Sequence, residues 1–283
     1  MATAIELLTN FKQLKTLPHI AIHLTQLLGD EKTTVKNLEE VIKLDPTLIL
    51  RVLRLVNSSY YGLIPKVESV YDAVVYLGME NIRNMIVVEA LKDIYRQEAI
   101  GDVFSRKKLW FHSAAVSICC QMLSERMFGI KGEDAFLCGI LHDIGLIVED
   151  QVMSEQFIHM CYAFQKGKKS IIDCETELIG TTHCSVGYHL AKEWKLPVEV
   201  QDGIRYHHKL QERIVPNSIA GILQLSEYLA IQMEYSAMPD MEAILSSPLR
   251  AHIQENLNEY KILLKDLPDE IERAKEIYNF HED

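Results

Sequence analysis

The segment Gly139-Ile-Leu-His142-Asp143-Ile-Gly145 places an imidazole beside a carboxylate in the most apolar part of the chain. That part, Ile140 to Val148, is far shorter than the roughly 18 apolar residues of a membrane span. Burying an imidazole or a carboxylate without a partner costs several kcal/mol. The His142-Asp143 pair therefore predicts a buried site in which both side chains have hydrogen-bond partners or hold a metal ion.

Apolar residues recur every three or four positions outward from this segment in both directions, which predicts an all-α protein. No alternating run of strand length has comparable extent, and the 283 residues include only 13 Gly and 8 Pro. Ser69 and Ser218 precede apolar runs and suit helix N-caps, and a second set of helices begins near Ser105. The expected helices include residues 17–28, 35–44, 46–56, 70–77 and 81–95, one following Ser218, and a peripheral acidic helix over 266–283.

The chain divides into two lobes at a break in the pattern between Gly101 and Ser105. Residues 1–104 are expected to form a helical N-terminal lobe that packs on a helical bundle over 105–210. Residues 211–283 are expected to be a C-terminal helical extension that completes the bundle. A length near two average domains accommodates this division.

Charge and cysteine usage limit the classes of partner. The net charge is −11, with 40 acidic and 29 basic residues and no long basic run, which argues against nucleic acid as a partner. The first residues lack the pattern of a secretory signal, so we expect a cytoplasmic protein with no membrane association. The six cysteines form no CxxC pair and are expected to be reduced thiols in packed helices.

Seven ligand-type residues lie on otherwise apolar helical stripes. A lone core histidine usually just hydrogen-bonds a carbonyl, so each of them has a simple structural explanation. Together, five imidazoles and two carboxylates are enough for two divalent ions, with Asp143 able to bridge them. A shell of this kind without thiolates favours iron or manganese, with nickel and zinc as alternatives. The predicted metal ligands are His112, His142, Asp143, His183, His207, His208 and Glu227.

The segment at 139–145 resembles the signature of the HD phosphohydrolase superfamily. Other motifs, in the same order along residues 14–210, resemble the HDOD family within it. This resemblance implies a helical N-terminal lobe packed on an HD-type helical bundle, and a bacterial signalling or regulatory module. The motifs are Leu17-Pro18, Asp45-Pro46-x-Leu48, Leu53 to Gly62, Ser69 to Gly78, Trp110-x-His112-Ser113, Glu175 to Gly187 and Trp194-x-Leu196-Pro197.

The resemblance also implies roles for the candidate ligands. His112 matches the first superfamily histidine, and His142-Asp143 matches the doublet. His183 and the pair His207-His208 resemble the extra histidines of HD-GYP phosphodiesterases, and Glu227 stands where the superfamily has its final Asp.

Two departures from the HD-GYP pattern bear on activity. Leu146 occupies the position of a phosphate-binding Lys, and no Gly-Tyr-Pro loop follows His208, although Arg205 or Lys209 could substitute for the missing cation. We therefore expect a non-catalytic or very weakly catalytic signal-transduction module that binds a signalling protein or a small nucleotide. The alternative is a metal-dependent phosphodiesterase or phosphohydrolase acting on nucleotides such as cyclic dinucleotides, with Asp143 as its catalytic residue. The sequence leaves the oligomeric state open.

Overall fold

The computed structural model describes residues 2–14, 27, 34, 37, 46–58, 61–64, 66–95, 103–167, 169–239 and 241–277. Every regular element among these residues is helical, which confirms the all-α fold class. The helices are α1 (Ala4–Leu14), α4 (Pro46–Val56), α5 (Val70–Leu77), α6 (Met79–Tyr95), α7 (Arg106–Met122), the π-helical turn η1 (Leu123–Met127), α8 (Glu133–Leu141), α9 (Ile144–Val152), α10 (Ser154–Lys166), α11 (Ile171–Leu178), α12 (His183–Glu193), α13 (Val198–Tyr206), α14 (Ile219–Gln232), α15 (Ser247–Glu255) and α16 (Leu257–Ile277).

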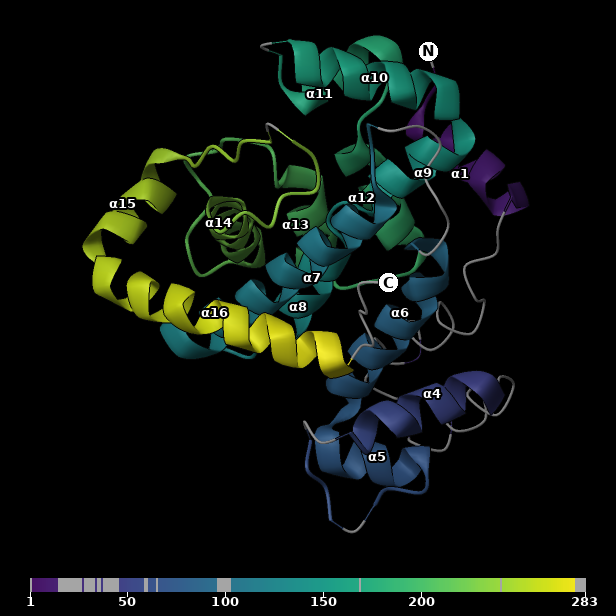
Figure 1. Ribbon diagram of the computed structural model, residues 1–283, viewed down its shortest axis with the longest axis vertical. Helices are drawn as coiled ribbons and strands as arrows, with labels where there is room; N and C mark the ends of the chain where they lie inside the picture. Colours follow the sequence, from purple (N-terminus) through teal and green to yellow (C-terminus); the bar gives the residue numbers. More distant parts are fainter. Residues whose placement is uncertain are drawn as a thin grey trace.

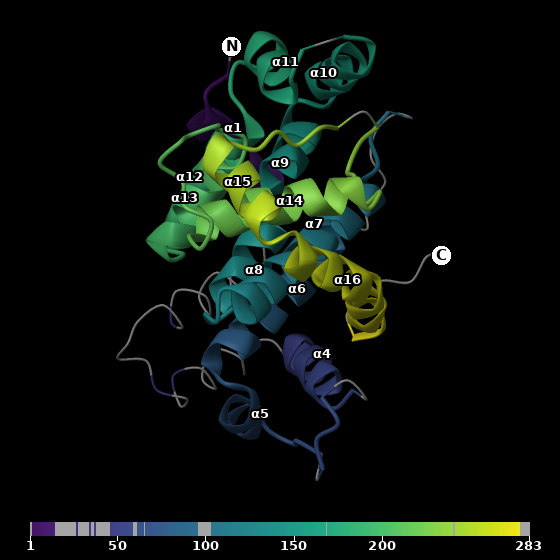
Figure 2. The same cartoon turned by 90° about the vertical axis from the view of Figure 1, so that its left-hand side faces the viewer.

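A large helical bundle occupies most of the molecule, and α4 and α5 lie at one end of it (Figures 1 and 2). Helix α6 joins the two parts, since it packs on α4 and α5 and also on α7 and α8. Helix α7 lies at the centre of the bundle and contacts α8, α14 and α16. Helix α1 packs on α9 and α12, so the described N-terminal helix contacts the bundle directly.

Serine caps fix three of the helix starts; the sequence predicts the caps at Ser69 and Ser218 and a helix start near Ser105. The side-chain oxygens of Ser69, Ser105 and Ser218 each accept a hydrogen bond from the backbone amide of the third residue of the helix that follows. The donors are Asp72 of α5, Lys108 of α7 and Gly221 of α14. Each bond satisfies an amide that has no partner within its own helix. The expected helices over 17–28 and 35–44 lie outside the described residues.

The C-terminal helix differs from its expected bounds, because α16 begins at Leu257 rather than near Asp266. Its buried stripe of Tyr260, Leu263, Leu267 and Ile271 starts before the acidic segment and continues through it. Apolar periodicity, rather than acidic composition, therefore defines this helix.

The bundle interior holds all six cysteines as free, buried thiols, as the sequence predicts. Among the described helices, none combines the length and apolar character needed to cross a membrane.

Candidate metal centre

Helix ends supply most of the predicted ligands. His142 directly follows α8, and Asp143 directly precedes α9. His183 is the first residue of α12, and His207 directly follows α13. Because these helix ends meet inside the bundle, side chains that are far apart in sequence project into one region.

His208 follows His207, and the two remaining ligands lie within helices, His112 on α7 and Glu227 on α14. Helix α7 approaches α8 closely because Gly139 has no side chain; a β-carbon there would lie 2.6 Å from the Cα of Ser117. All seven predicted ligands thus meet within the bundle, and six of them are less than 5% exposed.

The seven residues form two adjacent groups. We call Asp143, His183, His207 and His208 the histidine cluster, and His112, His142 and Glu227 the glutamate cluster. Within each group, one ligand atom from every residue lies within 4.8 Å of those from the others. Each group therefore has the donor types and the spacing that can hold a metal ion.

Asp143 faces both groups. Its Oδ1 lies 3.4 Å from His183 Nε2 and 3.5 Å from His207 Nε2. Its Oδ2 lies 3.2 Å from His142 Nε2 and 3.6 Å from His112 Nε2. The two carboxylate oxygens therefore point at separate sets of imidazole nitrogens, which is the arrangement of a bridging ligand.

Hydrogen bonds on the opposite side of each ring orient these imidazoles. The Nδ1 atoms of His112, His142 and His207 donate to the carbonyl oxygens of Tyr235, Gly139 and Ile204 at 2.6, 2.7 and 2.7 Å. A carbonyl can only accept, so Nδ1 carries the proton and a neutral ring presents the lone pair of Nε2 to the centre. Such partners are typical of histidines that bind metal.

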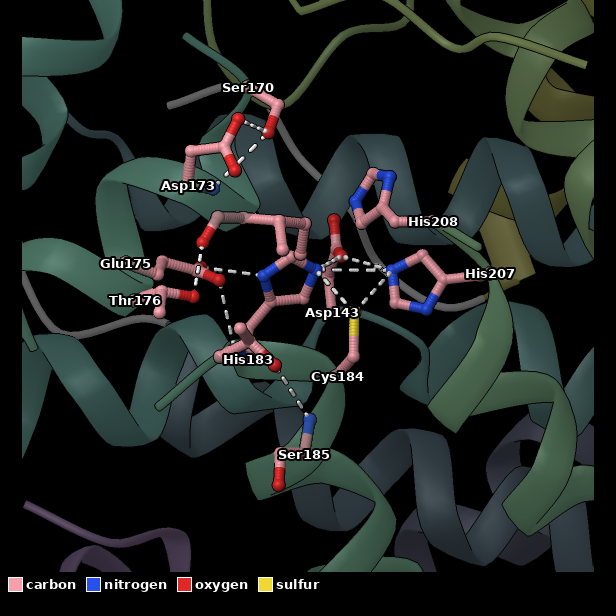
Figure 3. Close-up of polar contacts among 12 residues, drawn as sticks. Asp143, Ser170, Asp173, Glu175, Thr176, His183, Cys184, Ser185, His207 and His208 are labelled. Carbon is pink, nitrogen blue, oxygen red and sulfur yellow. Dashed lines mark hydrogen bonds and ion pairs between the residues drawn. The ribbon is translucent and has the colours of Figure 1, made fainter. Parts of the chain in front are cut away.

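Glu175, which is not among the predicted site residues, orients the ring of His183. Its Oε1 accepts from His183 Nδ1 at 2.6 Å, and its Oε2 accepts from the His183 backbone amide at 3.2 Å (Figure 3). Glu175 lies eight residues before His183 in one of the HDOD-like motifs, which was the only signal for it. It is fully buried, as is Glu149 beside it. Burial and the Glu175 carboxylate raise the pKa of Glu149 well above its usual value.

The atoms that face the centre have no hydrogen-bond partners among the described residues. They are His112 Nε2, His142 Nε2, both carboxylate oxygens of Asp143, His208 Nε2 and Glu227 Oε1. In addition, His183 Nε2 and His207 Nε2 lie 3.1 Å apart. Leaving buried polar atoms unpaired costs free energy, and two divalent cations, one in each cluster, would satisfy all of these atoms. The residues present therefore fit a metal pair.

Burial and neighbouring charges set the protonation state of each donor. Burial lowers the pKa of His112 to about 4, so its ring is neutral near pH 7. Burial also lowers the pKa of His208, and the neighbouring His207 adds to this effect. Although burial opposes ionisation of Asp143, His142 and the nearby rings hold its pKa well below its usual value. His183 and His207 differ: although burial opposes protonation, Cys184 and nearby carboxylates raise the pKa of both rings well above the usual value, so a bound metal ion would displace a proton from each.

A cavity of about 660 Å³ reaches this centre from the surface. His207, His208 and Glu227 line its inner end. The other walls include Phe164 of α10, the residues just before α11, the start of α11 and the segment 241–244. Among the described residues around it, Lys169 is the one lysine or arginine, and it forms an ion pair with Glu177 at 2.5 Å.

The other cations suggested by the sequence point elsewhere. Arg205 lies over the Tyr188 ring at 4.5 Å, and Lys209 lies over the Tyr206 ring at 5.2 Å. Neither lines the cavity, and Leu146 is fully buried in the core. The structure thus does not bring Arg205 or Lys209 to the place of the missing phosphate-binding Lys.

These features define an HD-type helical domain with a candidate metal centre. The sequence profile of the HDOD domain matches residues 14–210, and the chain belongs to that family. A Shewanella amazonensis structure, provisionally named as a phosphohydrolase, is similar with a TM-score of 0.68 and 28% identity, covering 97% of this chain and 95% of that one. A Marinobacter aquaeolei structure, provisionally named as a signal transduction protein, has a TM-score of 0.68 and 23% identity, covering 93% and 58%.

Similarity also extends to a longer curated sequence. An uncharacterised protein of Treponema pallidum is 24% identical over 198 residues, which are 69% of this chain and 37% of that protein. The matched region therefore spans little more than a third of that relative.

Proposed function

We propose that this protein is a bacterial, cytoplasmic signal-transduction module whose divalent-metal centre binds a nucleotide-type ligand and hydrolyses it very slowly or not at all. The observation that carries the proposal is Asp143, a fully buried carboxylate whose two unpaired oxygens face separate sets of imidazole nitrogens. A purely structural carboxylate in this position would leave several buried polar atoms without partners.

The histidine cluster and the glutamate cluster would each hold one ion, with Asp143 shared between them. Imidazole and carboxylate donors favour iron or manganese, with nickel and zinc as alternatives. When bound, the ions supply positive charge that attracts and polarises phosphoryl oxygens. The chain's own residues orient the donors, through the carbonyl partners of Nδ1 and through Glu175.

The cavity supports ligand binding at this centre. Its volume of about 660 Å³ lies within the range of small-molecule sites, and its inner end consists of three of the proposed ligands. Its walls include apolar side chains such as Phe164 and Ile171, which suit the flat face of a base. A nucleotide could thus place its phosphate toward the metal and its base against the wall.

The shortage of cations argues against efficient hydrolysis. Stabilising charge on the phosphoryl oxygens of a transition state requires fixed donors, and loss of one typically costs about 10²- to 10³-fold in rate. Lys169 is the one described cation lining the cavity, and Glu177 already pairs with it. Binding without rapid turnover is what a regulatory module requires. A signalling protein that senses the occupied state would be its partner, and we expect neither nucleic acid nor membrane to take that role.

A metal-dependent phosphohydrolase remains the second candidate, because the cavity opens directly onto His207, His208 and Glu227. The provisional name of the Shewanella amazonensis relative is consistent with such an activity. In that function Asp143 would be the catalytic residue that holds both ions in place.

Elemental analysis combined with turnover assays separates these functions. We expect purified protein to contain divalent metal, to bind nucleotides in a metal-dependent manner and to show little turnover of a panel of cyclic dinucleotides and activated phosphodiesters. Asp143→Ala should lose both metal and binding. Several turnovers per second on a natural nucleotide, abolished by Asp143→Ala, would establish the phosphohydrolase instead. Protein that stays free of metal after growth with added iron, manganese, nickel or zinc would contradict both functions.

A further inference from the structure

We propose that Cys184 supplies a thiolate ligand to the ion in the histidine cluster, so that this half of the centre prefers a softer metal such as zinc. The inference rests on the proposed metal centre and departs from one expectation from the sequence, namely a shell without thiolates. It concerns a residue that the HD-type motifs do not include.

Cys184 lies next to the proposed ligand His183, both in the sequence and in space. It occupies the first turn of α12 next to His183, and it is 6% exposed. Its Sγ lies 3.5 Å from His183 Nε2 and 3.8 Å from His207 Nε2. Figure 3 shows the sulfur pointing toward the same space as both rings and Asp143.

The separations between donor atoms match a tetrahedral shell. Around a zinc ion with bonds of about 2.3 Å to sulfur and about 2.1 Å to nitrogen and oxygen, tetrahedral geometry separates sulfur from nitrogen by about 3.6 Å and the lighter donors from one another by about 3.4 Å. The observed sulfur–nitrogen distances are 3.5 and 3.8 Å. The nitrogen–nitrogen distance is 3.1 Å, and the two nitrogen–oxygen distances to Asp143 Oδ1 are 3.4 and 3.5 Å.

An independent observation points to a ligand in this space. Asp143 is fully buried, and Oδ1, the oxygen that faces His183 and His207, has no hydrogen-bond partner among the described residues. A thiol alone would not satisfy two imidazole lone pairs and a carboxylate oxygen, whereas a cation bound by all four atoms would.

The two halves of the centre would then differ chemically. Within the histidine cluster, His183, His207 and Asp143 together with Cys184 offer two nitrogens, one oxygen and one sulfur, a set that zinc accepts readily. His208 lies at the cavity side of this cluster, where it can contact the ligand or add a fifth donor. The glutamate cluster offers only imidazole and carboxylate donors, which suit iron or manganese. Cys184 would bind as a thiolate and release its proton to solvent.

Cobalt(II) substitution tests this inference with a spectroscopic signal. Full-length protein would be stripped of metal and titrated with Co²⁺. Thiolate ligation produces an intense near-ultraviolet charge-transfer band, while any low-symmetry cobalt site produces weaker visible bands. We expect both in the unaltered protein, and loss of only the near-ultraviolet band in Cys184→Ser. Cys161→Ser, which alters a buried thiol on α10, is the matched control and should keep both.

Each outcome decides a separate point. Visible bands without the near-ultraviolet band in the unaltered protein would overturn ligation by Cys184 and leave the metal centre standing. Absence of bound cobalt, measured by elemental analysis after the titration, would overturn the metal centre and, with it, this inference.

X-ray absorption of the zinc-loaded unaltered protein covers the case in which Cys184→Ser fails to fold. A sulfur shell at about 2.3 Å supports the inference, and a shell of nitrogen and oxygen alone contradicts it.

Discussion

Gly145 packs against the backbone of His183 with no room for a side chain between them. A β-carbon at position 145 would lie 2.1 Å from the His183 carbonyl oxygen and 2.6 Å from its Cα. The contact joins the first turn of α9 to the first turn of α12. Because Asp143 lies two residues before Gly145, this contact also sets the 3.4 Å separation between Asp143 Oδ1 and His183 Nε2.

Gly145→Ala should therefore damage the metal centre by separating the two helices. The main chain of His183 cannot move aside as a flexible side chain would, and overpacking of this kind typically costs about 1–3 kcal/mol. We expect a lower melting temperature and loss of most bound metal, measured by thermal unfolding and elemental analysis. Gly129→Ala is the control.

Gly129 has φ of +62° and no atom within 4 Å of an added β-carbon. Alanine there should cost about 1 kcal/mol of backbone strain and leave the metal content unchanged. Equal metal loss in both variants would show that general destabilisation, not the contact with His183, empties the centre.

Substitutions at Asp143 and Glu227 should lower the metal content by different amounts. Asp143 faces both clusters, whereas Glu227 belongs to one of them. We expect Asp143→Asn to lose both ions and Glu227→Gln to lose about half of the metal, because each amide removes one anionic donor. Metal-to-protein ratios measured after identical growth and purification would test this. Glu125→Gln, an exposed substitution on η1, should keep the full content. Identical ratios in the first two variants would argue against a bridging role for Asp143.

Local chemistry explains which parts of the fold could be predicted. Helix starts at Ser69, Ser105 and Ser218 could be predicted because an N-cap depends only on the next few residues. Apolar stripes predict helices for the same reason, because their spacing depends only on neighbouring residues. The lone polar residues on these stripes likewise stand out as candidate site residues. The seven candidate ligands could be recognised as ligand-type residues on apolar stripes, and the family motifs added the long-range pairing that local pattern lacks.

Contacts between distant segments account for what was missed. Glu175 and Cys184 have ordinary local settings, and their closeness to His183 and His207 depends on how α11, α12 and α13 meet. Leu146 was compared with a phosphate-binding Lys because of its place in the motif. In the folded protein, however, the packing of the helices buries its side chain entirely. Interhelical geometry of this kind has no periodic signature in one sequence.

A buried ion pair joins α7 to α9 and should be costly to break. Arg106 donates to Asp150 Oδ2 at 2.5 Å, and their side chains are 5% and 0% exposed. Arg106→Ala leaves the carboxyl buried without its partner, so we expect a loss of about 3–5 kcal/mol in the free energy of unfolding. Urea denaturation would measure it. Arg126→Ala is the matched control, since the Arg126 pairs with Asp266 and Glu270 involve side chains 20–48% exposed.

The control should cost less than about 1 kcal/mol, as exposed ion pairs usually do. Arg106→Met combined with Asp150→Leu should recover much of the lost stability, because neither side chain leaves a buried charge. A small loss in Arg106→Ala would mean that water reaches Asp150.

Glu149 should make the stability of the protein depend on pH. Burial and the Glu175 carboxylate raise the pKa of Glu149 in the folded protein above its ordinary value of 4.5. A carboxyl with a raised folded-state pKa contributes its full stability below the unfolded-state value, and this contribution is lost as pH rises toward the folded-state value.

Glu149→Gln keeps the shape of the neutral side chain and cannot ionise. Its melting temperature should therefore exceed that of the unaltered protein by a margin that grows as the pH rises above about 5 and levels off above the folded-state pKa. The matching difference in the free energy of unfolding has a limiting slope of about 1.4 kcal/mol per pH unit. The melts would be recorded with a chelator, since metal binding also depends on pH. Glu125→Gln should show no such trend because Glu125 is exposed, and a margin that stays constant or shrinks with pH would mean that Glu149 is ionised in the folded protein.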